Sequence, residues 1–180
     1  SVLNPFEVRY HCPFMKVDLG HEDSSKVSSA LTLFQRVIRL VSKATGRFLT
    51  LHVGLGHDTT RILSWERTIT NLRSLVQYGA DRGVRVCLEN LAWGWTSKPN
   101  LFEKLIRRTG AGVTFDIGHA LASESVSNQY FSPEDFVSPH PNRVSNAHIY
   151  HTEFPGRGHV PPNSIEDIRD RLDILCKIGC

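Results

Sequence analysis

The sequence predicts an α/β fold in which parallel strands alternate with helices. Short apolar runs suited to buried strands recur along the chain, and segments with the helical spacing of apolar residues separate them. The runs are nearly continuous in Val, Ile, Leu and Phe, which is typical of strands buried on both faces. Strands joined through helices in this way are parallel, with right-handed crossovers.

Each element follows from its local pattern and from the residues that end it. Ser64 and Ser164 suit helix N-caps, Pro99 suits a first turn, and Gly46 and Gly110 suit C-caps. The expected strands are 7–12, 47–54, 83–90, 112–116 and 143–151, and the expected helices are 28–43, 64–78, 99–110 and 164–179. Residues 121–142 are expected to be irregular, with a short helix near Pro133.

Two architectures fit this alternation, an open doubly wound sheet and a (β/α)₈ barrel of the TIM type. A dinucleotide-binding open sheet carries a GxGxxG turn after its first strand. The corresponding segment here is HCPFMKVDLG, which lacks that motif, and the later GLG in HVGLGHD is too short to replace it. The sequence therefore favours the barrel.

Composition indicates one ordinary globular domain. The 180 residues are 40% hydrophobic and 22% charged, with a net charge of +3 and no clustering of basic residues that would indicate a nucleic-acid partner. No apolar run reaches the roughly 18 residues of a membrane span, and no secretory signal is visible. The four cysteines form no CxxC pair or disulfide framework, so we expect a reducing, cytoplasmic setting.

Polar, metal-capable side chains stand at the ends of all five expected strands. They are His11, His52, Glu89, Asp116 with His119, and His148 with His159 in the loop that follows. One such residue is usually a cap, but the C-terminal ends of parallel barrel strands share one rim, where active sites are built. Imidazole and carboxylate together suit divalent Zn, Mn, Fe or Co. The pattern predicts a metal site on that rim.

At these residues the chain resembles the xylose isomerase-like barrels, which include sugar isomerases and epimerases and the endonuclease IV type of AP endonuclease. The similarity runs in order through the chain and is strongest where DIGHA follows LEN. The matching segments are HCPF, LTLHVG, CLEN, FDIGHA, NAHIYH and GRGHVPP.

The resemblance implies roles for the rim residues. Glu89, Asp116 and His148 match the ligands of the single-metal site of the isomerases and epimerases, in which the residue matching Glu89 is also an acid/base. His119 matches a substrate-contacting histidine in the epimerases and a zinc ligand in the endonuclease. His11, His52 and His159 match further zinc ligands of the endonuclease, so they are expected as additional metal ligands if the centre is of that type.

Other positions depart from the family pattern or lie beside it. Arg157 stands where the endonuclease has an aspartate ligand, and a cation there suits a sugar hydroxyl or phosphate instead. His151 likewise replaces an aspartate. Trp93 follows the third expected strand, and either walls a substrate pocket or packs on the rim.

The resemblance begins at the second strand of the family barrel and stops before the seventh. Eight β–α units need roughly 250 residues, so we expect residues 1–180 to form a single, incomplete barrel domain holding strands two to six. A further ligand, a glutamate of the family's seventh strand, would lie beyond Cys180. Either the chain is part of a longer protein or a second copy, in a homo-oligomer, closes the gap.

The leading hypothesis is a metal-dependent isomerase or epimerase of a small sugar or sugar phosphate, acting through an enediolate with Glu89 as base. It requires one divalent ion (Mn, Zn, Co or Mg), and His119, Arg157 and Trp93 would contact the substrate. The alternative is a zinc-dependent AP endonuclease that cleaves abasic DNA and holds two or three ions. A third hypothesis is a non-enzymatic barrel with a vestigial metal site.

Overall fold

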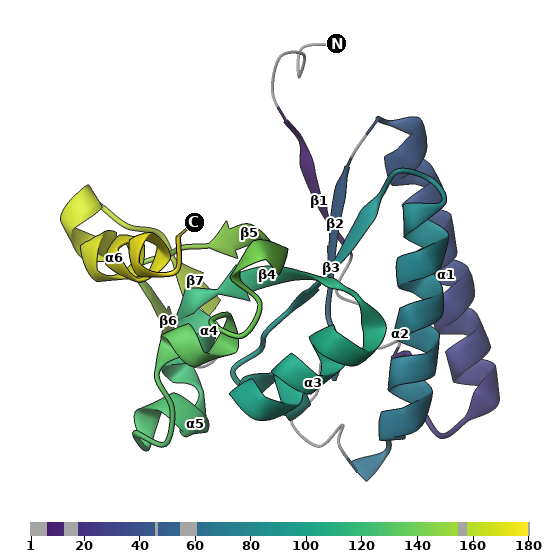
Figure 1. Ribbon diagram of the computed structural model, residues 1–180, viewed down its shortest axis with the longest axis horizontal. Helices are drawn as coiled ribbons and strands as arrows, with labels where there is room; N and C mark the ends of the chain where they lie inside the picture. Colours follow the sequence, from purple (N-terminus) through teal and green to yellow (C-terminus); the bar gives the residue numbers. More distant parts are fainter. Residues whose placement is uncertain (1–6, 13–17, 46, 55–60, 155–157, 180) are drawn as a thin grey trace.

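The sheet of this protein consists of five parallel strands whose spatial order equals their order in the chain (Figure 1). The computed structural model describes residues 7–12, 18–45, 47–54, 61–154 and 158–179. The strands are β1 (Arg9–His11), β2 (Phe48–Leu51), β3 (Arg85–Glu89), β4 (Gly112–Asp116) and β5 (Val144–His148). In a doubly wound sheet the order in which strands are added reverses at one point. The order here runs from β1 to β5 without reversal, which excludes that sheet and confirms the barrel type.

Three long helices cover one side of the sheet. They are α1 (Ser24–Lys43), α2 (Trp65–Ala80) and α3 (Pro99–Thr109), and they lie side by side in Figure 1. Their apolar stripes, for example Phe34 of α1 and Leu72 of α2, pack with Leu49, Leu51 and Leu88 of the strands into one core. This packing buries the helix-facing side of the strands whose C-terminal ends carry the polar residues.

The sheet is curled into a half-barrel, because side chains of its first and last strands touch. Arg9 of β1 donates hydrogen bonds to the carbonyl oxygen of Ser145 and to Oδ1 of Asn146 on β5. Beside them, Asn146 donates to the hydroxyls of Thr50 and Thr114, at 3.3 and 3.0 Å. These bonds satisfy the buried polar groups on the concave side of the sheet.

The remaining elements surround the end of the half-barrel. Short helices α4 (Ile117–Ala122) and α5 (Glu124–Ser127) connect β4 to β5, and α6 (Arg169–Lys177) follows at the C-terminal end. Single 3₁₀ turns are η2 (Trp95–Ser97), η3 (Pro133–Phe136), η4 (Pro141–Arg143) and η5 (Ile165–Ile168). Across the described ranges, the helices are all too short or too polar to cross a bilayer.

Several boundaries confirm the sequence prediction. Ser64 caps α2 by accepting a hydrogen bond from the backbone of Arg67, and Gly110 ends α3 with a φ of 77° that favours glycine. Ser164 opens the C-terminal helical segment with a capping box to Asp167, although the first turn is 3₁₀.

Other boundaries differ from the prediction. Helix α1 begins at Ser24, four residues early, because Asp23 accepts a hydrogen bond from the backbone of Ser25. It ends at Lys43, and Thr45 takes the positive φ expected of Gly46, which lies outside the described residues. Strand β5 stops at His148, and an unpredicted antiparallel hairpin of β6 (Thr152–Phe154) and β7 (Gly158–Val160) follows.

Phe102 of α3 tests the helix–sheet core. Its side chain is fully buried and lies 6.0 Å, between ring centroids, from Phe136. We expect Phe102→Ala to lower the free energy of unfolding by about 3–5 kcal/mol, because it removes buried area and leaves a cavity. Tyr130→Ala, at a residue 76% exposed, should change it by less than about 0.5 kcal/mol. Equal losses in the two variants, measured by urea denaturation, would contradict this core.

Candidate metal centre

The C-terminal ends of the strands gather the predicted histidines and carboxylates on one rim. Three overlapping groups have ligand atoms within 4.8 Å of one another. The groups are His11 with His52 and Glu89; Glu89 with Asp116 and His148; and Asp116 with His119 and His159. The two carboxylates are shared between groups, so the three form one continuous cluster.

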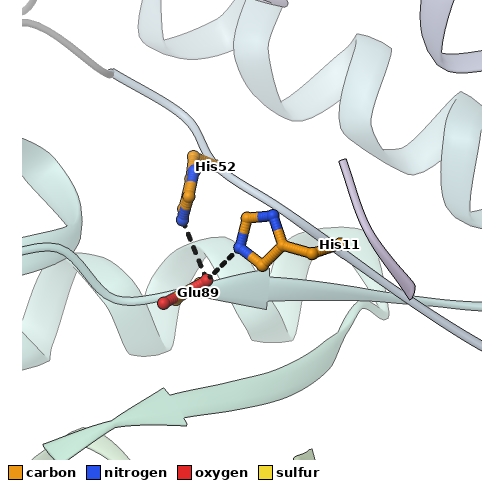
Figure 2. A group of neighbouring side chains, drawn as sticks. All are labelled: His11, His52 and Glu89. Carbon is orange, nitrogen blue, oxygen red and sulfur yellow. Dashed lines mark hydrogen bonds and ion pairs between the residues drawn. The ribbon is translucent and has the colours of Figure 1, made fainter. Parts of the chain in front are cut away.

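Glu89 lies at the centre of this cluster, with a side chain only 2% exposed. Its Oε2 accepts hydrogen bonds from His52 (2.8 Å) and His11 (3.0 Å), which point toward it in Figure 2, and its Oε1 accepts one from His148 (2.8 Å). Burial acts to raise the pKa of Glu89, but these bonds outweigh it and hold the pKa well below the usual range. The carboxylate is therefore an anion at neutral pH.

His11 and His148 carry charge that compensates Glu89 when no metal is bound. Nδ1 of His11 donates to the carbonyl oxygen of Cys12 (2.8 Å) while Nε2 donates to Glu89, so both ring nitrogens carry protons. Burial lowers the pKa of His11, but the bonds to Glu89 and Cys12 raise it above its ordinary value overall. Burial also opposes the charge of His148, yet its interactions with Asp116 and Glu89 raise its pKa to about 10.

Asp116 supplies the observation that bears most directly on a metal. Its Oδ1 accepts two hydrogen bonds, from the backbone of His119 (2.7 Å) and from the hydroxyl of Tyr150 (2.8 Å). Its Oδ2 is buried and has no hydrogen-bond partner within the described part of the chain. Nδ1 of His119 and Nδ1 of His148 each lie 3.7 Å from that oxygen, beyond hydrogen-bond distance.

A divalent cation fits this arrangement. Burying an unpaired carboxylate oxygen is costly unless a cation or a donor meets it. Here Oδ2 of Asp116, which no described residue hydrogen-bonds, faces the imidazole of His148, which in turn contacts Glu89. Two carboxylates and an imidazole are suitable ligands for zinc, manganese or cobalt.

Asn90 and helix α4 hold the ligands in place. Asn90 exchanges two hydrogen bonds with the backbone of Asp116, at 2.7 and 2.8 Å, and so joins the ends of β3 and β4. Its own carbonyl oxygen accepts a bond from Nδ1 of His119 (3.0 Å). That bond places the lone pair of His119 on Nε2, which lies 3.4 Å from Nε2 of His159.

Of the predicted substrate-contacting residues, His119 belongs to the cluster and Trp93 lies beside it. The ring of Trp93 lies 5.9 Å from that of His119, and its Nε1 donates to the carbonyl oxygen of Gly54 (3.2 Å), so it stands at the edge of the cluster. Arg157 lies outside the described residues. His151 hydrogen-bonds the backbone of Asp167 (3.3 Å) and belongs to none of the three groups.

Sequence reasoning assigned no role to Asn90 or Tyr150. Both lie within the segments that carried the resemblance, CLEN and NAHIYH. Asn90 directly follows Glu89 and Tyr150 lies two residues after His148, and this nearness to a predicted ligand is the available signal. The sequence does not show which strand end or helix each one contacts.

A singly wound parallel β/α half-barrel with histidines and carboxylates on its C-terminal rim defines the general class of this protein. A family model described as xylose isomerase-like TIM barrel matches residues 4–178. The chain therefore belongs to the xylose isomerase-like TIM barrel family.

Individual relatives agree with this assignment. An uncharacterised protein of Methanocaldococcus jannaschii is 28% identical over 174 residues, which are 96% of this chain and 69% of the relative. A solved D-tagatose 3-epimerase-like protein superposes with a TM-score of 0.68 at 19% identity, covering 99% of this chain and 70% of that one. D-allulose 3-epimerase from Methylomonas sp., solved in complex with D-allulose, gives 0.69 at 16% identity, covering 99% and 63%.

Asp116→Asn tests the unpaired oxygen. The amide keeps an oxygen for the donors at Oδ1 but removes the anionic oxygen that faces His148. We expect the affinity for Zn²⁺ or Mn²⁺ to fall about 100-fold or more, beyond the range typical of losing an outer-shell partner. The metal-free protein should become less stable, because the variant removes the anion that faces protonated His148. Chelator competition measures the affinity, and the exposed Asp173→Asn is the matched control. Unchanged metal affinity in Asp116→Asn would contradict the site.

The pH dependence of metal binding gives a second test. Ligation through Nδ1 of His148 requires this nitrogen to lose its proton, and the interactions with Asp116 and Glu89 raise the pKa of His148 to about 10. Below that pH, the apparent association constant should rise about tenfold per pH unit for each proton released. We expect release of at least one proton per ion between pH 6 and 8.5, measured by titration calorimetry in buffers of different ionisation enthalpy. A pH-independent affinity would show that His148 is not a ligand through that atom.

Proposed function

We propose that this chain is a metal-dependent isomerase or epimerase of a small sugar or sugar phosphate. The observation that carries the proposal is the buried Oδ2 of Asp116, which accepts no hydrogen bond from the described residues and lies beside His148 and Glu89. Family membership supports it, since solved relatives of the same fold are named D-tagatose 3-epimerase-like protein and D-allulose 3-epimerase.

In this proposal Glu89, Asp116 and His148 hold one divalent ion, of Mn, Zn, Co or Mg. When bound, such an ion acts as a Lewis acid that favours negative charge on neighbouring substrate oxygens. His119 and Trp93, and Arg157 from outside the described residues, contact the sugar. The remaining chemistry is proton transfer by the residues of the chain.

Glu89 is the proposed base, taking a proton from the carbon next to the substrate carbonyl to give an enediolate. Its low pKa keeps it ionised and ready to accept a proton, but also makes it a weak base. His148 cannot donate Nδ1–H to Glu89 and serve as a ligand through the same atom. A His148 that binds the ion through Nδ1 would therefore no longer donate to Oε1 of Glu89, while His11 and His52 would still donate to Oε2.

The number of carboxylates separates isomerisation from epimerisation. One base can return a proton to a neighbouring carbon on the same face of an enediolate, which suffices for aldose–ketose isomerisation. Inversion at one carbon needs a second acid on the opposite face. The three ligand groups contain only Glu89 and Asp116 as carboxylates, and Asp116 is held by Tyr150 and His119. An epimerase would therefore draw its second acid from elsewhere.

Proton exchange with solvent tests this mechanism. We expect the Mn²⁺-loaded protein to exchange the proton next to the carbonyl of a suitable ketose or ketose phosphate in D₂O, followed by NMR. Glu89→Gln should slow the exchange about 10²–10⁴-fold, while the exposed Glu124→Gln leaves it unchanged. Exchange that persists in Glu89→Gln would assign the base to another residue.

A second candidate function has its own observation. The groups containing His11 with His52, and His119 with His159, flank the central one. They would suit a zinc-dependent AP endonuclease that holds two or three ions and cleaves abasic DNA. Metal stoichiometry of the purified protein separates the two: one ion per chain supports the isomerase, and three, with incision of abasic duplex, support the endonuclease.

A further inference from the structure

We infer that Tyr150 is a positioning residue of the metal centre, which leaves Asp116 one oxygen for metal binding and holds His159 beside His119. The inference rests on the metal site in the proposed function, and concerns a residue to which neither the sequence pattern nor the family resemblance gave a role. Tyr150 follows β5 and is only 5% exposed. Its two ends make different contacts.

The hydroxyl end fixes the orientation of Asp116. It donates to Oδ1 at 2.8 Å, and the backbone N–H of His119 donates to the same oxygen at 2.7 Å. Two donors converge on one oxygen, while the other, Oδ2, is buried and no described residue donates a hydrogen bond to it. A partial rotation of the carboxylate out of its present plane would break both bonds, so one oxygen is kept toward the two donors and the other toward His148.

The ring end holds His159. The rings of Tyr150 and His159 stack with centroids 3.9 Å apart and planes 11° from parallel. His159 lies on β7, whose strand pairing is with β6 and not with the main sheet. Stacking on Tyr150 therefore ties His159 to the rim, where its Nε2 lies 3.4 Å from Nε2 of His119.

Gly118 makes the space that Tyr150 occupies. A Cβ at residue 118 would lie 2.2 to 2.4 Å from Cζ, Cε2 and the hydroxyl oxygen of Tyr150. Gly118 lies inside α4 and is not among the positive-φ glycines, so its backbone conformation does not require glycine. Glycine also disfavours helix. The close approach of the tyrosine ring is the physical reason for a glycine here.

Cobalt binding by Tyr150→Phe tests the inference. The variant keeps the ring and its stacking on His159 but removes the donor to Asp116. We expect Co²⁺ affinity to fall about 10- to 100-fold, as is typical when an outer-shell partner of a ligand is lost, together with a changed visible absorption of the bound Co²⁺. Tyr78→Phe is the matched control, because it removes the phenol hydroxyl of a half-buried residue of α2, which accepts an exposed hydrogen bond from Arg39 far from the rim. It should bind Co²⁺ like the wild type.

Gly118→Ala completes a double-mutant cycle. The added methyl should displace the ring and weaken Co²⁺ binding even with the hydroxyl present. Adding Tyr150→Phe should then weaken it by less than the product of the two separate effects, since both act on one contact. If Gly118→Ala does not fold, the comparison of Tyr150→Phe with Tyr78→Phe decides alone.

The outcomes distinguish failure of this inference from failure of the proposed metal site on which it rests. Wild-type-like Co²⁺ affinity and absorption in Tyr150→Phe would overturn the positioning role and leave the metal centre standing. Failure of the wild-type protein to bind Co²⁺, Zn²⁺ or Mn²⁺ would overturn both. Equal loss of affinity in Tyr150→Phe and Tyr78→Phe would mean a general effect on the fold, and would also overturn the positioning role.

Discussion

The arrangement of this rim depends on one constraint, the burial of two carboxylates at the ends of adjacent strands. Glu89 and Asp116 have side chains 2% and 0% exposed. Transfer of an ionised carboxylate out of water is strongly unfavourable unless opposite charge or hydrogen bonds replace the water. For Glu89, three imidazoles meet both oxygens. For Asp116, Oδ1 accepts two hydrogen bonds and Oδ2 accepts none from the described residues. The imidazole of His148 lies 3.7 Å from Oδ2, and a bound cation would compensate that oxygen more directly.

The barrel geometry places these groups without local strain. Alternate residues of each strand point to the concave side, so Thr50 and Thr114 lie one step below His52 and Asp116 on the same strands or their extensions. The lower residues bond to one another through their hydroxyls, 2.7 Å apart, and to Asn146. A satisfied polar layer thus lies beneath the rim, and the ligands rest on groups that themselves have partners.

Sequence alone was sufficient for the parts of the structure that depend on local pattern. The order and parallel alignment of the five strands, the caps Ser64 and Gly110, and the gathering of His11, Glu89 and Asp116 on one rim follow from periodicity and from the parallel topology. The roles of Tyr150 and Asn90 were not predictable, because they consist of contacts with residues 26 to 34 positions away. The β6–β7 hairpin was missed because strands of three residues are too short to show a period.

The count of available oxygen atoms bears on the choice between one metal ion and three. Glu89 offers its oxygens to two sides, with Oε1 toward His148 and Oε2 toward His11 and His52. Asp116 belongs to two groups but offers only Oδ2, because Tyr150 and the backbone of His119 occupy Oδ1. The central and His119–His159 groups must therefore share that one oxygen or compete for it. A trinuclear cluster needs more from Asp116 than a single ion does, and this arrangement favours the isomerase over the endonuclease.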